Sequence, residues 1–450
     1  MMSDDLLIPR RKRGAHALRA GAVVVAALAF VTPAVIADPV AAAGARTVRV
    51  SVTSSQRQAR GISLNPRISA NGRYVAFVSN APNLAPGGAK DAFNAFVRDR
   101  QAGTTRQVNL SGSGAPGDDG ITGDIRISAD GRYVAFSSSA GNLVHGDTNG
   151  TSDVFVRDLQ RQRTTRVSLS GTGAQGNDFS SGSLGLSADG RYVAFESYAT
   201  NLVPGDTNGF ADLFLHDRRT GRTSRVNLGD DGSQANHVSG SPSVSADGRY
   251  VAFTSYAGNL VAGDTNNQFD VFVRDRRTGR TTLISRTPAG RPGQFNSYAS
   301  SISADGRYVA FTSDSLDLVG GDLNEYNHVF VRDLRIGRTT LVSVSSSGRQ
   351  ANDFCNRVTM SADGRYVLFS SRANTLVPGD TNAVEDVFLR DRWRRTTTRI
   401  SLTDSGGQSN GYSSGPSIGA GGHIVTFESN AGNLVPGDTN AEPDVFVRVR

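Results

Sequence analysis

The stretch Ser-Ala-Asp-Gly-Arg-Tyr-Val-Ala-Phe at residues 128–136 decides the fold, because the chain repeats it at a nearly constant spacing. Seven copies are recognisable; the first and last are degenerate, and the sixth has leucine in place of the second alanine. They begin at Ser69, Ser128, Ser187, Ser245, Ser303, Ser361 and Gly419. Successive copies lie 58 or 59 residues apart, and self-similarity at such a period is typical of repeat architectures.

Each repeat predicts four short antiparallel strands. The first precedes the Asp-Gly pair, whose glycine tolerates the positive φ of a tight hairpin turn. The second strand is the Arg-Tyr-Val-Ala-Phe stretch. The third is Asp-Val-Phe-Val-Arg-Asp, as at 153–158, and the fourth is Thr-Thr-Arg-Val-Ser-Leu, as at 164–169. Alternation mixed with apolar runs suits stacked strands, so the repeats predict an all-β, seven-bladed β-propeller of four-stranded blades.

The two ends of the repeat array indicate how the ring closes. The last repeat stops after its third strand, at 444–450, whereas residues 47–51 have the pattern of a fourth strand ahead of the first repeat. We therefore expect the N-terminal strand to complete the last blade, which places the propeller at residues 46–450. Such closure covers a strand edge that would otherwise be open to aggregation.

Residues 1–45 predict a secretory signal peptide. Four basic residues at 10–13 precede an apolar run from Gly21, and small residues follow it. We expect cleavage after about residue 37 or 43, and a secreted or otherwise extracytoplasmic protein. The alternative is an uncleaved anchor, but the run is short for a membrane span of about 20 residues. No stable membrane span is expected after cleavage.

Charge and cysteine content indicate which class of partner is disfavoured and where the stability of the fold comes from. The formal charge is +7; residues 1–45 hold five positive and three negative groups, which leaves +5 for the remainder. Arginine and aspartate are interspersed there, which favours a mixed solvated surface over nucleic-acid binding. The single cysteine, Cys355, cannot form an internal disulfide, so stability is expected to come from packing and strand pairing. We expect a monomer.

The repeated motif at 128–136, followed by the third-strand motif at 153–158, resembles the repeats of TolB-like, WD40-like (PD40-type) propellers of bacterial envelopes. The resemblance covers residues 46–450. It implies the propeller fold, and it implies a role as an interaction scaffold, although other members serve as enzymes or accompany a peptidase domain. This chain departs from the namesake in having longer repeats, and seven of them instead of six.

Two kinds of connection are long in every repeat, and they emerge on one face, which we call the long-loop face. They join the second strand to the third, and the fourth to the first strand of the next blade. The remaining turns are short and define the short-turn face. Because ligand contacts usually lie on loops held by a rigid scaffold, we expect binding at the long-loop face.

An Asp-x-Asn-x-x-x-Asp pattern in the loop before the third strand suggests a calcium site. Oxygen ligands at positions 1, 3 and 7 resemble part of a calcium loop, although the ligand count is incomplete. Asx-turn hydrogen bonding within the loop is the alternative interpretation. The first repeat replaces all three positions, with Gly88, Lys90 and Asn94, and the fifth has Asp322, Asn324 and His328. The predicted ligands are Asp147, Asn149, Asp153, Asp206, Asn208, Asp212, Asp264, Asn266, Asp270, Asp380, Asn382, Asp386, Asp438, Asn440 and Asp444.

Two further sets of residues on the long-loop face are candidates for binding a glycan or a protein. Gln-x-Asn pairs occur at Gln175 and Asn177, Gln234 and Asn236, Gln350 and Asn352, and Gln408 and Asn410. The alternative is that these amides tie adjacent loops together. One loop position varies sharply between repeats, and we expect Tyr198, Tyr256, Asp314 and Arg372 to form a contact arc there. Ordinary surface variation would explain the same position without a ligand.

Signals of catalysis are weak. The sequence contains no His-x-x-x-His pair, and its histidines occupy different positions of the repeat, so no catalytic residue is predicted. The leading hypothesis is therefore a secreted or envelope-associated, non-catalytic propeller that binds a protein or glycan. A propeller enzyme of the polysaccharide lyase or glycosidase type is the first alternative. A calcium-stabilised structural module is the second, and calcium is the one cofactor that the sequence suggests.

Overall fold

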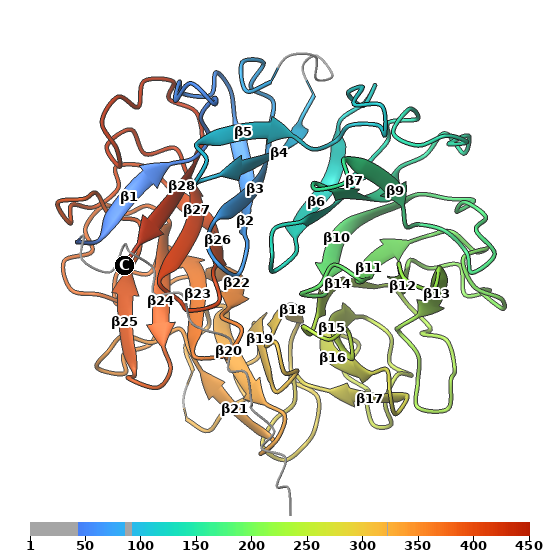
Figure 1. Ribbon diagram of the computed structural model, residues 1–450. Helices are drawn as coiled ribbons and strands as arrows, with labels where there is room; N and C mark the ends of the chain where they lie inside the picture. Colours follow the sequence, from blue (N-terminus) through green and yellow to red (C-terminus); the bar gives the residue numbers. More distant parts are fainter. Residues whose placement is uncertain (1–43, 86–91, 322) are drawn as a thin grey trace, which may run out of the picture. The chain divides into compact units, whose positions relative to one another are not determined.

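The computed structural model describes residues 44–85, 92–321 and 323–450, which form seven four-stranded antiparallel sheets. The sheets are the blades of a propeller, arranged in chain order around a central axis (Figure 1). The predicted fold class is therefore confirmed. The predicted signal peptide falls almost entirely outside the described residues, as do Gly88, Lys90 and Asp322. In the part of the chain that is described, no helix is long and apolar enough to cross a membrane.

Each blade runs from an innermost to an outermost strand in sequence order. Blade 1 contains β2 (Ser63–Ile68), β3 (Tyr74–Ser79), β4 (Asn94–Asp99) and β5 (Thr104–Gln107), and blade 2 contains β6 (Ile121–Ile127), β7 (Tyr133–Ser138), β8 (Asp153–Asp158) and β9 (Arg163–Arg166). Blade 3 contains β10 (Ser180–Leu186), β11 (Tyr192–Ser197), β12 (Asp212–Asp217) and β13 (Arg222–Arg225), and blade 4 contains β14 (Ser239–Val244), β15 (Tyr250–Ser255), β16 (Asp270–Asp275) and β17 (Arg280–Leu283). Blade 5 contains β18 (Ser297–Ile302), β19 (Tyr308–Ser313), β20 (His328–Asp333) and β21 (Arg338–Leu341), and blade 6 contains β22 (Cys355–Met360), β23 (Tyr366–Ser371), β24 (Asp386–Asp391) and β25 (Thr396–Arg399). Blade 7 contains β26 (Ser413–Ile418), β27 (Ile424–Ser429), β28 (Asp444–Val449) and β1 (Arg46–Arg49).

Strand β1 closes the ring by joining the two ends of the propeller. It pairs with β28 in antiparallel register from Arg46↔Val449 to Arg49↔Phe446, and Figure 1 shows the two strands side by side. The strand also brings Arg49 to within 3.2 Å of the carboxylates of Asp438 and Asp444. The expected completion of the last blade by the N-terminal strand is confirmed.

The hydrophobic core lies between neighbouring blades, because each sheet is packed on both faces. One cluster joins Ala76, Val97 and Val108 of blade 1 to Val134 and Phe136 of blade 2. Within a blade, the phenylalanines of the second and third strands stack, with ring centroids 5.6–6.0 Å apart. Successive side chains of such a strand point to opposite faces of the sheet, and both faces are buried. This explains the apolar runs in the repeats.

The repeated motif builds both the turn and a salt bridge, as blade 5 illustrates. The Ser303 hydroxyl donates to Asp305 at 2.6 Å and accepts a hydrogen bond from the Tyr308 amide at 2.9 Å. Gly306 supplies the positive φ, at 73°. Arg307 reaches across to Asp333 at the end of β20, with a shortest separation of 2.7 Å. The motif is therefore a compact hairpin, pinned by an ion pair between the second and third strands.

The same turn also docks onto the preceding blade. A Cβ at Gly306 would lie 2.1 Å from Cδ2 of Tyr250 in blade 4, so only glycine allows this approach. Equivalent contacts join Gly131 to Tyr74, Gly190 to Tyr133, Gly248 to Tyr192, Gly364 to Tyr308 and Gly422 to Tyr366. The alanine of the turn also donates its backbone N–H to the corresponding alanine of the next blade, for example from Ala246 to Ala304 at 3.0 Å. The contact is therefore a repeated lock between blades.

We predict that Gly306→Ala destabilises the protein by about 3 kcal/mol, because it adds overpacking against Tyr250 to the strain of a positive φ. Gly379→Ala is the matched control, since Gly379 has a similar φ of 71° but nothing within 4 Å of its added Cβ. The control substitution should lower the free energy of unfolding by only about 1 kcal/mol. Urea unfolding would measure both losses, and equal losses would mean that the tyrosine contact does not contribute.

We also predict that deletion of residues 46–52 opens the ring. The deletion removes the β1–β28 pairing together with the buried side chains of Val50 and Val52. The expected loss is at least about 3 kcal/mol, from hydrogen bonds and apolar burial together. Thermal unfolding of the truncated protein, with and without a synthetic peptide of residues 46–52, would test this. An unchanged melting curve would contradict closure by this strand.

Candidate functional site: the central channel

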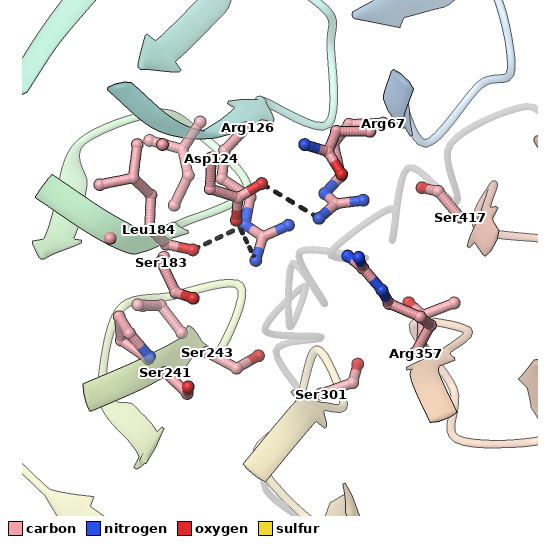
Figure 2. A pocket seen from close by; sticks show the side chains of 18 of the residues that line it. Arg67, Asp124, Arg126, Ser183, Leu184, Ser241, Ser243, Ser301, Arg357 and Ser417 are labelled. Atoms are coloured by element: carbon pink, nitrogen blue, oxygen red, sulfur yellow. Dashed lines mark hydrogen bonds and ion pairs between the residues drawn. The ribbon is translucent and has the colours of Figure 1, made fainter. Parts of the chain in front are cut away.

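The innermost strands of all seven blades line a central cavity of about 610 Å³. Its wall is mostly polar, and serine, glycine and threonine predominate (Figure 2). Three arginines stand out against this background: Arg67 from β2, Arg126 from β6 and Arg357 from β22. A concave site lined by few charged groups is where a ligand is expected to bind.

A β-bulge in the innermost strands helps to aim side chains into the channel. The register shifts between Leu64 and Arg67 in blade 1, and at the corresponding place in blades 2 to 7. In blade 6 the bulge residue is Arg357, which has a φ of 50°. A bulky residue in this left-handed region costs of order 1–3 kcal/mol, and such strain gathers at functional sites. Bulges re-aim side chains in the same way beside active sites.

Two glutamates hold these bulges in place. Glu428 accepts a hydrogen bond from the Asn65 amide at 2.7 Å, and Glu196 accepts one from the Ser241 amide at 2.7 Å. Burial raises the pKa of Glu196, although hydrogen bonds from backbone amides oppose that effect. Both carboxylates therefore act as anchors for backbone N–H groups in the channel wall.

The arginines form an unbalanced positive cluster. Asp124 lies 3.1 Å from a terminal nitrogen of Arg67 and 2.7 Å from one of Arg126. Arg126 also donates from Nε to the Leu184 carbonyl at 2.6 Å. Arg357 is exposed, pairs with no carboxylate of the described chain, and points into the cavity towards Arg67 (Figure 2). Three guanidinium groups thus share the cavity with two carboxylates, those of Asp124 and Glu196.

Burial and charge act against each other in this cluster. Burial is the largest influence on Asp124, yet Arg126 and Arg67 outweigh it and lower the pKa of the carboxyl group. Burial lowers the pKa of Arg126 to about 10, even though Asp124 opposes the shift. Asp124 and Arg126 therefore keep their charges at neutral pH, and arginines outnumber carboxylates among the residues that line the cavity.

The sequence-based reasoning missed these arginines, although a signal for them exists. Arg67 and Arg126 stand two residues before the serine of the repeated motif. The other five repeats have small residues there, namely Gly185, Ser243, Ser301, Thr359 and Ser417. Comparing this position across the repeats would have identified the departure, since a large charged residue replaces a small one in two adjacent blades.

The predicted calcium loops hold an arginine where a calcium loop would hold its ion. In blade 2, Arg166 of the outermost strand lies 3.0 Å from Asp147 and 2.9 Å from Asp153. The same arrangement joins Arg225 to Asp206 and Asp212, Arg399 to Asp380 and Asp386, and Arg49 to Asp438 and Asp444. The loop asparagines also hydrogen-bond within the loop, as from Asn149 to Asp153 at 3.0 Å. Across the described residues, no group of three or more His, Cys, Asp or Glu side chains is arranged to hold a metal ion.

Blades 4 and 5 lack this arginine. Blade 4 has Leu283 at the position, so Asp264 and Asp270 have no cation beside them. Burial raises the pKa of Asp264 to about 6 and that of Asp270 to about 7. In blade 5 His328 replaces the last aspartate, hydrogen-bonds Ser343 and Asn324, and has a pKa lowered to about 4 by burial. In blade 1, Asn94 accepts from Asn109 at 2.8 Å.

The Gln-x-Asn pairs tie neighbouring loops together. Gln175 accepts from Arg166 at 2.8 Å and donates to Thr148 at 2.6 Å. Asn177 donates from its side chain to Thr200 at 2.9 Å, so the connection is held between the loops of blades 2 and 3. Gln234, Gln350 and Gln408 accept hydrogen bonds in the same way, and Asn236, Asn352 and Asn410 contact Asn259, Asn374 and Asn433.

The four candidate residues at the variable loop position have different surroundings. Tyr198 is 41% exposed and its ring lies 4.7 Å from that of Phe179. Tyr256 lies between His237 and Phe269, at 4.6 and 5.1 Å. Asp314 accepts a hydrogen bond from Asn327 at 3.0 Å, and Arg372 is exposed. The two tyrosines thus belong to aromatic groupings, and Asp314 and Arg372 are not part of them.

Comparison with known proteins identifies the fold. No family model and no curated protein matches the chain. Oligogalacturonate lyase from Vibrio parahaemolyticus is similar in structure, with a TM-score of 0.53 and 13% identity over 90% of this chain and 97% of the lyase. A second oligogalacturonate lyase structure, in complex with manganese, has a TM-score of 0.53 and 13% identity, over 91% of this chain and 94% of that one. TolB from Acinetobacter baumannii also matches, with a TM-score of 0.41 and 16% identity over 85% of this chain and 81% of TolB.

These likenesses show the propeller fold alone, because sites are grafted onto folds independently. The seven-bladed propeller expected from the repeated motif is confirmed by the seven four-stranded blades. The function therefore has to be argued from the channel itself.

The unpaired carboxylates of blade 4 give a prediction about pH. Because their pKa values are raised in the folded state, folding binds protons, and stability should fall as the pH rises from about 4 to about 7. Leu283→Arg should restore the ion pair found in four other blades and stabilise the protein by about 1–3 kcal/mol at about pH 8, with less gain at about pH 5.

Leu341→Arg is the matched control, because blade 5 presents His328 in place of Asp270. Urea unfolding of both variants at the two pH values gives the comparison. An equal effect of the two substitutions, or a gain from Leu283→Arg that does not depend on pH, would contradict the assignment of the raised pKa values to Asp264 and Asp270.

Proposed function

We propose that the protein is an extracytoplasmic, non-catalytic binding propeller whose central channel takes the carboxylate of a uronic acid in a glycan. The observation that carries this proposal is the convergence of Arg67, Arg126 and Arg357 on one cavity. Its two carboxylates already have partners, because Asp124 pairs with Arg67 and Arg126, and Glu196 accepts a hydrogen bond from the Ser241 amide. Guanidinium groups bind carboxylates through two parallel hydrogen bonds, and partial burial strengthens the attraction. Arg357 offers the unpaired group, and Arg67 has a buried Nε without a hydrogen-bond partner in the described chain.

Binding without catalysis is supported by the state of the acidic groups in the channel. A general base has to be free to accept a proton from the ligand. Asp124 is held by two arginines, and Glu196 and Glu428 accept hydrogen bonds from bulge amides. The polysaccharide lyase or glycosidase alternative would need one of these carboxylates to leave its present partner.

The extracytoplasmic location rests on the predicted signal peptide and on the resemblance of the repeats to TolB-like envelope proteins. A glycan of the cell envelope is consistent with that location.

The proposal is tested by calorimetric titration of the full chain with sodium glucuronate, sodium galacturonate and glucose. The two uronates should bind and glucose should not, and raised salt should weaken the binding because charge attraction contributes. Arg357→Ala and Arg67→Ala should each weaken uronate binding by about tenfold or more. Arg163→Ala, at an exposed arginine at the start of β9, is the control and should bind like the parent.

Two results would contradict the proposal. Binding that is equal for glucuronate and glucose, or unchanged by Arg357→Ala, would remove the channel as a carboxylate site. Release of unsaturated sugars from an oligogalacturonate on incubation with the protein would instead establish the lyase alternative.

A further inference from the structure

A row of aromatic rings crosses the long-loop face of blades 3 to 5. It consists of Phe210, His237, Tyr256, Phe269 and Tyr298, and we call it the aromatic shelf. Consecutive ring centroids along the row are 4.6, 4.6, 5.1 and 5.7 Å apart. The rings come from four segments of the chain, since Tyr256 and Phe269 share the connection between β15 and β16, so the fold assembles them side by side.

The shelf is open to solvent. Tyr298 is 39% exposed, and the other four rings are partly exposed. The loop position that holds Tyr256 holds Asn80 in blade 1, Ser139 in blade 2 and Asn430 in blade 7. The repeat therefore does not require an aromatic residue there, and packing of the blades does not explain the row. Contiguous exposed aromatic surface on a soluble protein typically marks an interaction site.

The shelf leads into the channel. Tyr298, at its end, lines a cavity of about 530 Å³ together with Arg357, Tyr412 and Glu385. Arg357 also lines the central cavity, where it faces Arg67 (Figure 2). A ligand on the shelf could thus continue past Tyr298 and place one end among the arginines.

The groups around the shelf select the chemistry of the ligand. Glu385 and Glu428 line the cavity next to Tyr298, and the charge of Asp314 adds to the effect of burial in raising the pKa of Tyr298. These carboxylates would repel a chain with an anionic group at every unit, such as a single-stranded nucleic acid. They would accept hydrogen bonds from hydroxyl groups, while aromatic rings pack against flat apolar faces. Neutral sugar rings meet both requirements.

We propose that the aromatic shelf binds the neutral sugar rings of an oligosaccharide whose terminal uronic acid lies among the channel arginines. This inference rests on the proposed function, because it assumes that the channel holds the acidic end. It adds the class of the ligand: a mostly neutral oligosaccharide with one acidic terminal sugar.

The test is a titration of the full chain with glucuronic acid alone and with glucuronic acid linked to one, two or three xylose units. Affinity should rise with each xylose, by about 10- to 100-fold over the series, because each added sugar ring packs against a further part of the shelf. Tyr256→Ala and Tyr298→Ala should flatten this dependence on length and leave the affinity for glucuronic acid nearly unchanged.

Trp393→Ala is the matched control. Trp393 is 63% exposed, but it lies in the turn between β24 and β25 on the short-turn face. This variant should retain the full dependence on length, and thermal unfolding of all three variants would confirm that they fold.

The outcomes separate the shelf from the channel. Arg357→Ala should lower the affinity for every member of the series by a similar factor, and its failure to do so contradicts the channel site. An affinity that does not rise with xylose units, or tyrosine variants that bind the whole series like the parent, would overturn the shelf. Tighter binding of oligouridylate or of poly-glutamate than of the glucuronic acid series would overturn it as well.

Discussion

The contact between a turn glycine and the tyrosine of the preceding blade is the constraint on which the rest of the structure depends. A methyl group at Gly306 would overlap the ring of Tyr250, and the same contact recurs at five further blade junctions. Where blade 7 has Ile424 in place of the tyrosine, Gly72 of blade 1 packs against that side chain instead. Because backbone hydrogen bonds between turn alanines accompany these contacts, the angle between blades is fixed at the edge of the channel.

A ring fixed in this way leaves some positions free to vary, and those positions carry the proposed site. The serine, glycine and tyrosine of the motif cannot change without loss of packing. The residue two places before that serine lines the channel in every blade, and it is Arg67 in blade 1 and Arg126 in blade 2 where the other blades have a small residue. The same reasoning applies to the loop position of Tyr256. Function is thus expected where the repeats differ, and stability where they agree.

The sequence was sufficient for the fold because one motif contains the turn, the interblade contact and the core residues in nine positions. The closure of blade 7 was also predictable, since residues 47–51 match the fourth-strand pattern. The cation that pairs with the loop carboxylates was harder to predict. Asp147 and Asp153 suggest a cation, but their partner, Arg166, lies 13 residues beyond Asp153 in the outermost strand. Only the pairing of β8 with β9 brings the arginine between them. The channel arginines were missed because the comparison of repeats concentrated on loops.

The rigid ring also explains how the channel can keep an unpaired arginine. Arg357 occupies the left-handed region and forms no ion pair with a carboxylate of the described chain, two features that a flexible strand would relax. The neighbouring strand β23 and the glycine–tyrosine contacts with blades 5 and 7 hold β22 in place. Packing that the repeats already provide therefore offsets the free-energy cost of the strained backbone and the unpaired charge. A site that is preorganised in this way loses little entropy when it binds an anion. The glutamates that anchor the bulges of blades 1 and 4 act in the same direction, because they fix the channel wall before any ligand arrives.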